Sequence, residues 1–142
     1  TAVSHNNSLS VSGGTEKSNY RASVTYLNQP GVALNSGFDR LNARLNMNQK
    51  ALNDKLDIQF LVSANTSKRN FIQYDAFRSA LRINPTLPVF NEDGTFFQPT
   101  GFEIENPVAR AAQLTDQRRD NQFLLNSKLF YEIIDGLRVG VN

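Results

Sequence analysis

The sequence contains no cysteine and no tryptophan, and it has a single methionine and a single histidine, His5. Without cysteine there are no disulfides and no thiolate metal ligands, and a lone histidine leaves no His/Cys metal cluster and no Cys/His catalytic pair. No grouping of a nucleophile, a base and an orienting residue stands out either. These absences predict a protein that is not an enzyme and that uses no metal or other cofactor.

Long hydrophobic runs and a strong charge of one sign are also missing. No stretch approaches the roughly 18 apolar residues of a transmembrane helix, and the mean hydropathy is -0.42. The 15 basic and 13 acidic residues leave a formal charge of +2, which is too small to indicate a nucleic-acid partner. A membrane β-barrel remains compatible with these values, because only every second residue of its strands faces lipid.

The clearest pattern is an alternation of apolar and polar residues between Phe38 and Asn65. In the predicted strand 38–48 the odd positions from Leu41 to Met47 are apolar, and in the predicted strand 55–65 the even positions are apolar, with Leu61 as the exception. Since side chains alternate across a strand, both runs predict strands with one apolar and one polar face, joined by a turn at Asn53 and Asp54. Their length matches the roughly 9 to 11 residues of a tilted membrane-spanning strand and is about twice that of a usual soluble strand.

Similar alternation elsewhere predicts an all-β fold, an antiparallel meander of long strands that forms part of a large transmembrane β-barrel. The predicted strands are about 4–13, 19–28, 38–48, 55–66, 121–134 and 137–142. Short turns follow the odd-numbered strands and longer loops follow the even-numbered ones, as in outer-membrane barrels. The apolar side chains expected to share a lipid-facing surface are Leu41, Leu45, Leu56, Ile58, Phe60, Leu125 and Leu129.

One segment, residues 66–120, interrupts the strands and is far longer than a usual connection. Within it we expect a helix at Asp75–Ile83, ended by Pro85, and a hairpin around Asn91-Glu92-Asp93-Gly94. The rest is expected to be an extracellular loop, including Pro107 and residues 113–120. Its aromatic side chains are candidates for contacts with a sugar or a partner protein, although a loop of this size also needs a small core of its own. They are Phe71, Tyr74, Phe77, Phe90, Phe96, Phe97 and Phe102.

Two stretches of the sequence resemble the SusC/RagA family of TonB-dependent outer-membrane transporters. They are VSGGTEKSNYRAS with the following YLNQPG, and NPTLPVFNEDG within the long segment. The resemblance implies a plugged barrel of about 22 strands, in the cell outer membrane, of which residues 1–142 would be a part of the barrel domain just after the plug. The absence of an initiator Met at Thr1 and the strand pattern that runs up to Asn142 also suggest a piece of a longer chain.

The same resemblance implies a function and partners. It implies import of oligosaccharides or peptides, capture together with a SusD-like surface lipoprotein, and energy from the TonB complex through regions outside this chain. The remaining partner is outer-membrane lipid.

Four polar residues at even positions, Arg40, Asn42, Arg44 and Asn46, are predicted to face the lumen. There they would bind the plug or passing substrate, or they would merely keep the inner face wet. The alternative function is a soluble all-β surface binding module, such as an adhesin or a carbohydrate-binding domain. Strand length favours the transporter.

Overall fold

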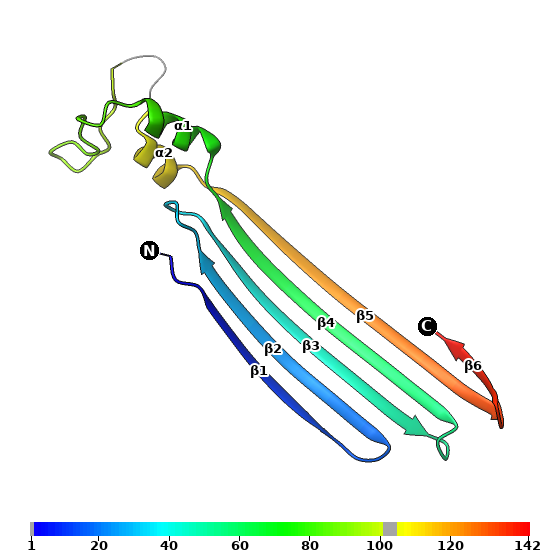
Figure 1. The fold of residues 1–142 in the computed structure, drawn as a ribbon. Coiled ribbons are helices and arrows are strands. Elements are labelled where there is room, and N and C mark those ends of the chain that lie inside the picture. Colours follow the sequence, from blue (N-terminus) through cyan, green and yellow to red (C-terminus); the bar gives the residue numbers. More distant parts are fainter. Residues whose placement is uncertain (1, 101–104) are drawn as a thin grey trace. The chain divides into compact units, whose positions relative to one another are not determined.

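The computed structural model describes residues 2–100 and 105–142. Within these residues six strands form one antiparallel sheet in sequence order, so the predicted all-β meander is confirmed (Figure 1). The strands are β1 (His5–Gly14), β2 (Ser18–Pro30), β3 (Gly37–Ala51), β4 (Leu56–Phe71), β5 (Asp116–Ile134) and β6 (Leu137–Val141), and the helices α1 (Tyr74–Arg82) and α2 (Pro107–Gln113) lie between β4 and β5 in the chain. Neither of these described helices has the length and apolar character needed to span a membrane.

Strands β4 and β5 are longer than the alternation pattern predicts. β4 continues to Phe71 and β5 begins at Asp116, so the predicted loop 66–120 was too long at both ends. The segments TSKRNF and DQRRD are polar at nearly every position, and a ladder of backbone hydrogen bonds does not require an apolar face. Hydrophobic periodicity marks only the part of a strand that has one apolar side, and it therefore missed these ends.

The short connections fall after β1, β3 and β5, as predicted. Asn53 and Asp54 adopt left-handed backbone conformations, with φ of 56° and 67°, in the turn between β3 and β4. Leu52 joins them at φ 53°, which the sequence did not predict, because a leucine rarely tolerates this region. In the turn between β5 and β6, Gly136 has φ 87°, a value that glycine adopts at low cost.

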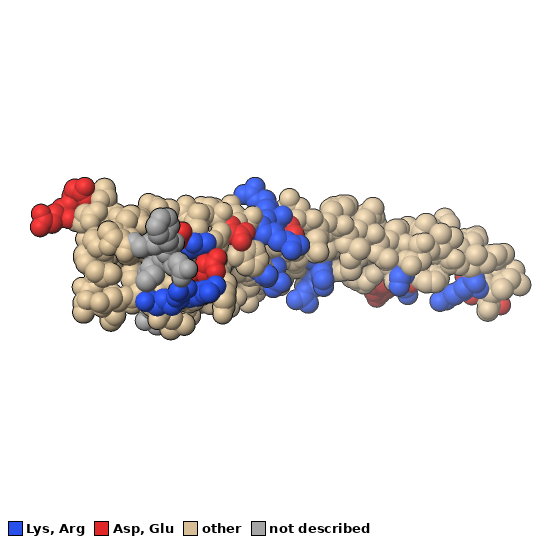
Figure 2. Space-filling view, turned by 90° about the horizontal axis from the view of Figure 1, so that it is seen from above, with Lys and Arg blue, Asp and Glu red and all other residues tan. Residues whose placement is uncertain are grey.

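The register of the sheet separates an apolar face from a polar face. Leu9 lies opposite Val24, while Ser10 lies opposite Ser23, and directly opposed residues point to the same side. A hollow on the apolar face is lined by side chains from four adjacent strands, among them Leu9, Val24, Leu45 and Val62. Figure 2 shows this separation of the two faces near the end of the sheet that carries the short turns. There the charged side chains gather along one margin.

The chain divides into two compact units. The sheet unit comprises Ser4–Asn28, Asp39–Ser67 and Arg119–Asn142, and the loop unit comprises Gln29–Phe38 and the described part of Lys68–Arg118, with the N-terminal residues. Within the described residues, no side chain of the sheet unit is buried. Of the side chains predicted to share the apolar face, Leu41, Leu45, Leu125 and Leu129 are exposed and Leu56, Ile58 and Phe60 are half-buried.

The loop unit, in contrast, contains buried residues, and among those that the structure describes Asn106 is the most buried at 2% exposure. Its side-chain oxygen accepts hydrogen bonds from the backbone N–H groups of Val108 (3.0 Å) and Ala109 (3.3 Å), which caps the start of α2. Its amide donates to the carbonyl oxygens of Val89 (2.8 Å) and Phe97 (2.9 Å). Asn106 therefore joins α2 to the hairpin at residues 89–97.

Both predicted elements of the loop unit are present, and one was missed. The helix expected at Asp75–Ile83 is α1, and the expected hairpin has Phe90 paired with Phe96 and Gly94 at φ 80°. Helix α2, which was assigned to loop, was missed. Its signal was the pair Asn106-Pro107, a capping residue followed by a proline at the first helical position.

Candidate functional site

A polar hollow of about 490 Å³ on the sheet unit is the first candidate site. Three of the four residues predicted to face a lumen, Arg40, Asn42 and Arg44, line it together, because they follow one another at period two on β3. Asn46 belongs to the same face of β3 but does not line the hollow. The remaining lining residues come from β2, β4 and β5 and are Thr25, Ser63, Asn65, Gln122 and Leu124.

The hollow offers hydrogen-bond donors and positive charge without a carboxylate among its lining residues. The amide of Asn65 donates to the side-chain oxygen of Gln122 at 3.5 Å, and its own oxygen is buried without a hydrogen-bond partner. Arg40 and Arg44 are exposed. Such a surface can bind carboxylates, sulfates or hydroxyl groups of a sugar or a polar protein segment, and it contains no activated nucleophile or paired acid and base.

The opposite face of the sheet carries an apolar band, which is a region of apolar side chains that ends at polar residues. At that limit the amide of Asn28 donates to Asp39 and the hydroxyl of Thr66 donates to Asn121, each at 2.6 Å. All four positions have the strand parity of the apolar residues, so these pairs mark where the band stops toward the β2–β3 and β4–β5 connections.

The height of the apolar band follows from β3. Between Asp39 and Gln49 the residues of this face are Leu41, Ala43, Leu45 and Met47. At about 3.4 Å per residue this stretch covers roughly 34 Å along the strand, or about 26 Å across a membrane for a strand tilted by about 40°. The apolar band of an outer-membrane barrel is about 25 Å tall.

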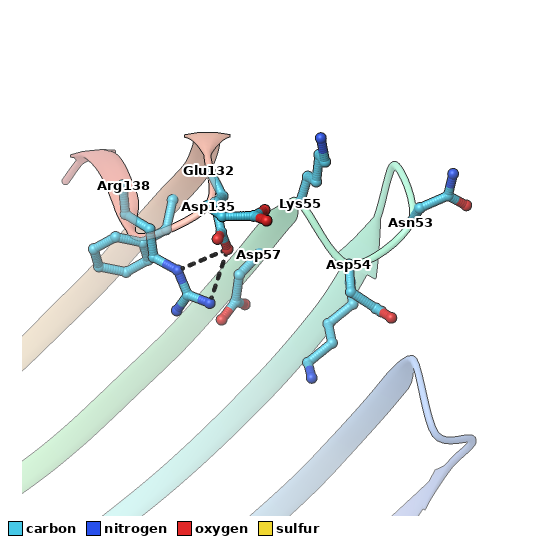
Figure 3. A pocket seen from close by; sticks show the side chains of 9 residues that line it. Asn53, Asp54, Lys55, Asp57, Glu132, Asp135 and Arg138 are labelled. Carbon is cyan, nitrogen blue, oxygen red and sulfur yellow. Dashed lines mark hydrogen bonds and ion pairs between the residues drawn. The ribbon is translucent and has the colours of Figure 1, made fainter.

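A second hollow, of about 400 Å³, lies at the short-turn end of the sheet unit (Figure 3). There Arg138 donates from Nε and from a terminal nitrogen to one oxygen of Glu132, both at 3.2 Å, and the backbone N–H of Gly136 donates to the other oxygen at 3.3 Å. These bonds tie β6 and the turn before it to the end of β5. Figure 3 shows Asp57 and Asp135 near this ion pair. No sequence motif pointed to the cluster, because its members come from β4, β5, β6 and the turn between β5 and β6.

The predicted loop aromatics are distributed over several elements. Phe71 is the last residue of β4 and not part of a loop, and Tyr74 and Phe77 lie on α1. The rings of Phe90 and Phe96 lie 5.1 Å apart within the hairpin, and Phe97 follows with its backbone N–H bonded to the carbonyl of Val89. Phe102 lies outside the described residues. Tyr74 is 80% exposed, so part of this set is free to contact another molecule.

The ion pairs of α2 and the hydrogen bonds of the hairpin hold the loop unit together. Arg110 on α2 pairs with Glu105 and with Asp75 of α1, the latter at 3.3 Å, which links the two helices.

In the hairpin, the hydroxyl and the backbone N–H of Thr95 donate to Asp93, at 2.6 and 2.9 Å, and lower the pKa of that carboxyl. Within the described residues, no cluster of His, Cys, Asp and Glu is suited to hold a metal ion.

Comparison with known proteins connects this geometry to a family. No family model matches the chain. It is 30% identical over 93% of its length to the TonB-dependent receptor P3 of Formosa agariphila and 28% identical over 93% to the TonB-dependent receptor SusC of Bacteroides thetaiotaomicron. The chain belongs to the SusC-like TonB-dependent receptors. A third relative, the TonB-dependent receptor P26 of Formosa agariphila, is 31% identical over 84% of the chain.

The resemblance inferred from the sequence is thus confirmed. These relatives are named receptors rather than enzymes, and the chain spans only 12% to 16% of their length. The apolar band and the polar hollow are therefore features of one segment of a SusC-like receptor.

Proposed function

We propose that residues 1–142 are part of the barrel domain of an outer-membrane receptor that imports oligosaccharides or peptides. In this proposal a SusD-like surface lipoprotein helps to capture the substrate, and the TonB complex supplies energy through regions outside this chain. The observation that carries the proposal is the single-layered sheet, with an apolar band on one face and a polar hollow on the other.

A single-layered sheet is stable only where something covers its apolar face. The exposed side chains of that face include Leu9 at 72% and Leu125 at 54%, and leaving a leucine in water forfeits about 1.5 to 3 kcal/mol of burial free energy. A soluble binding module would cover these residues with a second sheet or a helix, and no described element of the sheet unit does so. In a membrane, lipid covers the apolar face, so the burial free energy is not lost.

The two faces then have separate roles. The apolar band contacts outer-membrane lipid, and Arg40, Asn42 and Arg44 face the lumen, where they bind the plug or the passing substrate. The long connections lie outside the cell and the short turns in the periplasm, as in other barrels of this kind. The loop unit would then contribute to substrate capture or to contact with the lipoprotein, through exposed aromatics such as Tyr74.

The test is to shorten the connection between β4 and β5 in the full-length receptor. Residues 73–114 are replaced by a short turn, and surface labelling verifies that the receptor still inserts. We expect substrate uptake and co-purification of the lipoprotein to fall at least tenfold, because the exposed aromatics are removed. A matched variant with an altered turn at residues 52–55, on the opposite end of the strands, should retain both activities.

Two results would contradict the proposal. If the shortened receptor keeps normal uptake and normal co-purification, the loop unit has no part in capture. If the full-length receptor is found outside the outer membrane, the assignment of the apolar band to lipid fails.

A further inference from the structure

An arginine lies against two phenylalanine rings in the loop unit. The guanidinium carbon of Arg69 is 4.9 Å from the ring centroid of Phe38 and 5.6 Å from that of Phe71. Arg69 and Phe71 are alternate residues at the end of β4, and Phe38 is the second residue of β3. The three side chains therefore lie on the same side of two strands, held together by cation–π attraction.

The hydrogen-bonding edge of Arg69 is unused by the described part of the chain. None of its five N–H donors has a carboxylate or another acceptor among the described residues, and the side chain is exposed. A guanidinium that lies over aromatic rings keeps its N–H groups directed outward in its own plane, where they match a carboxylate or a sulfate in bidentate geometry. The rings fix the orientation of the cation before any ligand binds.

Phe71 adds a surface for an apolar ligand face. Phe71 is 40% exposed, so part of its ring remains open beside the cation, whereas Phe38 is half-buried. The C–H face of a sugar ring packs on such a surface, while its acidic substituent can reach the guanidinium. On β3, Phe38 is followed at period two by Arg40, Asn42 and Arg44, which continues the cationic character along the same strand face.

We propose that Phe38, Arg69 and Phe71 form a binding subsite for an acidic sugar residue, carboxylated or sulfated, within an oligosaccharide. This inference rests on the proposed function and narrows its substrate class to anionic glycans. Arg69 supplies the charge and the paired donors, the ring of Phe71 supplies the contact surface, and both rings hold the arginine in place.

The test measures binding to the purified full-length receptor by calorimetry. The probes are an oligogalacturonate, a sulfated carrageenan oligosaccharide and a neutral malto-oligosaccharide of equal length. In the variant Arg69→Gln we expect binding of at least one anionic probe to weaken at least tenfold, with binding of a neutral glycan changed less than twofold. The matched control is Arg78→Gln, which removes an exposed arginine of α1 and should leave all affinities within twofold.

Two further variants separate charge from geometry. Arg69→Lys keeps the charge but loses the planar pair of donors, so its affinity should lie between those of the wild type and Arg69→Gln. Phe71→Leu should weaken binding of the same anionic probe without abolishing its preference over the neutral one. Heat-modifiable migration on gels verifies that each variant barrel is folded.

The results distinguish this inference from the proposed function. Equal affinities for Arg69→Gln and Arg78→Gln, or a wild-type receptor that binds only neutral glycans or peptides, would overturn the subsite and leave the importer proposal standing. A wild-type receptor that binds no oligosaccharide and no peptide would overturn both. The carboxylated and sulfated probes identify which acid the subsite prefers.

Discussion

In the loop unit, the side chains of Ala76, Asn106 and Ala109 are buried between two helices and a hairpin, whereas no described side chain of the sheet unit is buried. The loop unit thus has a small interior around one polar residue, Asn106. The hydrogen bonds of the Asn106 side chain are made to backbone groups of the same chain. The sheet unit has its backbone ladder but no interior. This difference indicates that the loop unit is stabilised by contacts among its own residues. The stability of the sheet unit depends instead on what contacts its two faces.

The comparison predicts that a charge on the apolar face has the largest effect. Leu45 lies near the middle of the apolar band on β3, and Leu45→Arg should cost about 2 to 4 kcal/mol at the membrane midplane. We expect the full-length variant to fail to assemble in outer membranes, measured by heat-modifiable migration of the membrane fraction.

The matched control for this prediction is the next residue. Asn46→Arg places the same charge on the polar face and should assemble normally. Equal assembly of both variants would show that lipid does not cover the face that carries Leu45.

Removing the buried amide of the loop unit should have a local effect that leaves assembly in the membrane intact. Asn106→Ala leaves two backbone N–H groups and two carbonyl groups without their partner. The expected cost is about 2 to 4 kcal/mol, since both a helix cap and buried hydrogen bonds are lost. Hydrogen exchange at residues 105–114 of the full-length receptor should accelerate, while exchange in β3 stays unchanged.

The control for Asn106 is Asn91, an exposed amide in the hairpin. Asn91→Ala should accelerate exchange much less, because water replaces its lost partners. If exchange in β3 rises together with that of residues 105–114, the two units do not have independent stability.

The smallest expected effect concerns the hairpin turn. Gly94 has φ 80°, and a side chain there would meet no atom within 4 Å. Gly94→Ala therefore tests the backbone alone and should cost about 1 to 2 kcal/mol of local stability, measured as faster exchange at residues 89–97. Gly94→Asn should cost less, because asparagine tolerates this conformation; an identical effect of both variants would point to a lost contact instead.

Sequence periodicity predicted the sheet unit well, because its one-sided burial leaves a trace at every second residue. Leu41 and Leu45 were assigned to the apolar face and Arg40 and Arg44 to the opposite one from this alternation alone. The same rule failed at Lys68 and Arg118, where both faces of the strand are polar and the alternation disappears although the ladder continues.

The loop unit was less predictable because its contacts join residues that are far apart in the chain and leave no periodic pattern in the sequence. The hairpin at Gly94 was found from its turn residues, and α1 from its apolar spacing. Nothing in the local sequence indicated that Asn106 would also bond to Val89 and Phe97, since these partners come from a distant part of the chain. The contact of Arg69 with Phe38 escaped notice for the same reason.

Two glycines of the sheet each lie beneath an aromatic ring of the opposing strand. Gly13 faces Tyr20, and Gly140 faces Phe130. A Cβ atom would come within 2.7 Å of the Tyr20 hydroxyl oxygen or 2.6 Å of the Phe130 ring, so neither glycine can change while its aromatic neighbour stays in place. Each pair therefore behaves as one mutational unit. In a double-mutant cycle, replacing the glycine should be harmful with the aromatic ring present and far better tolerated after the ring has been reduced to alanine, with a coupling of about 0.5 to 3 kcal/mol.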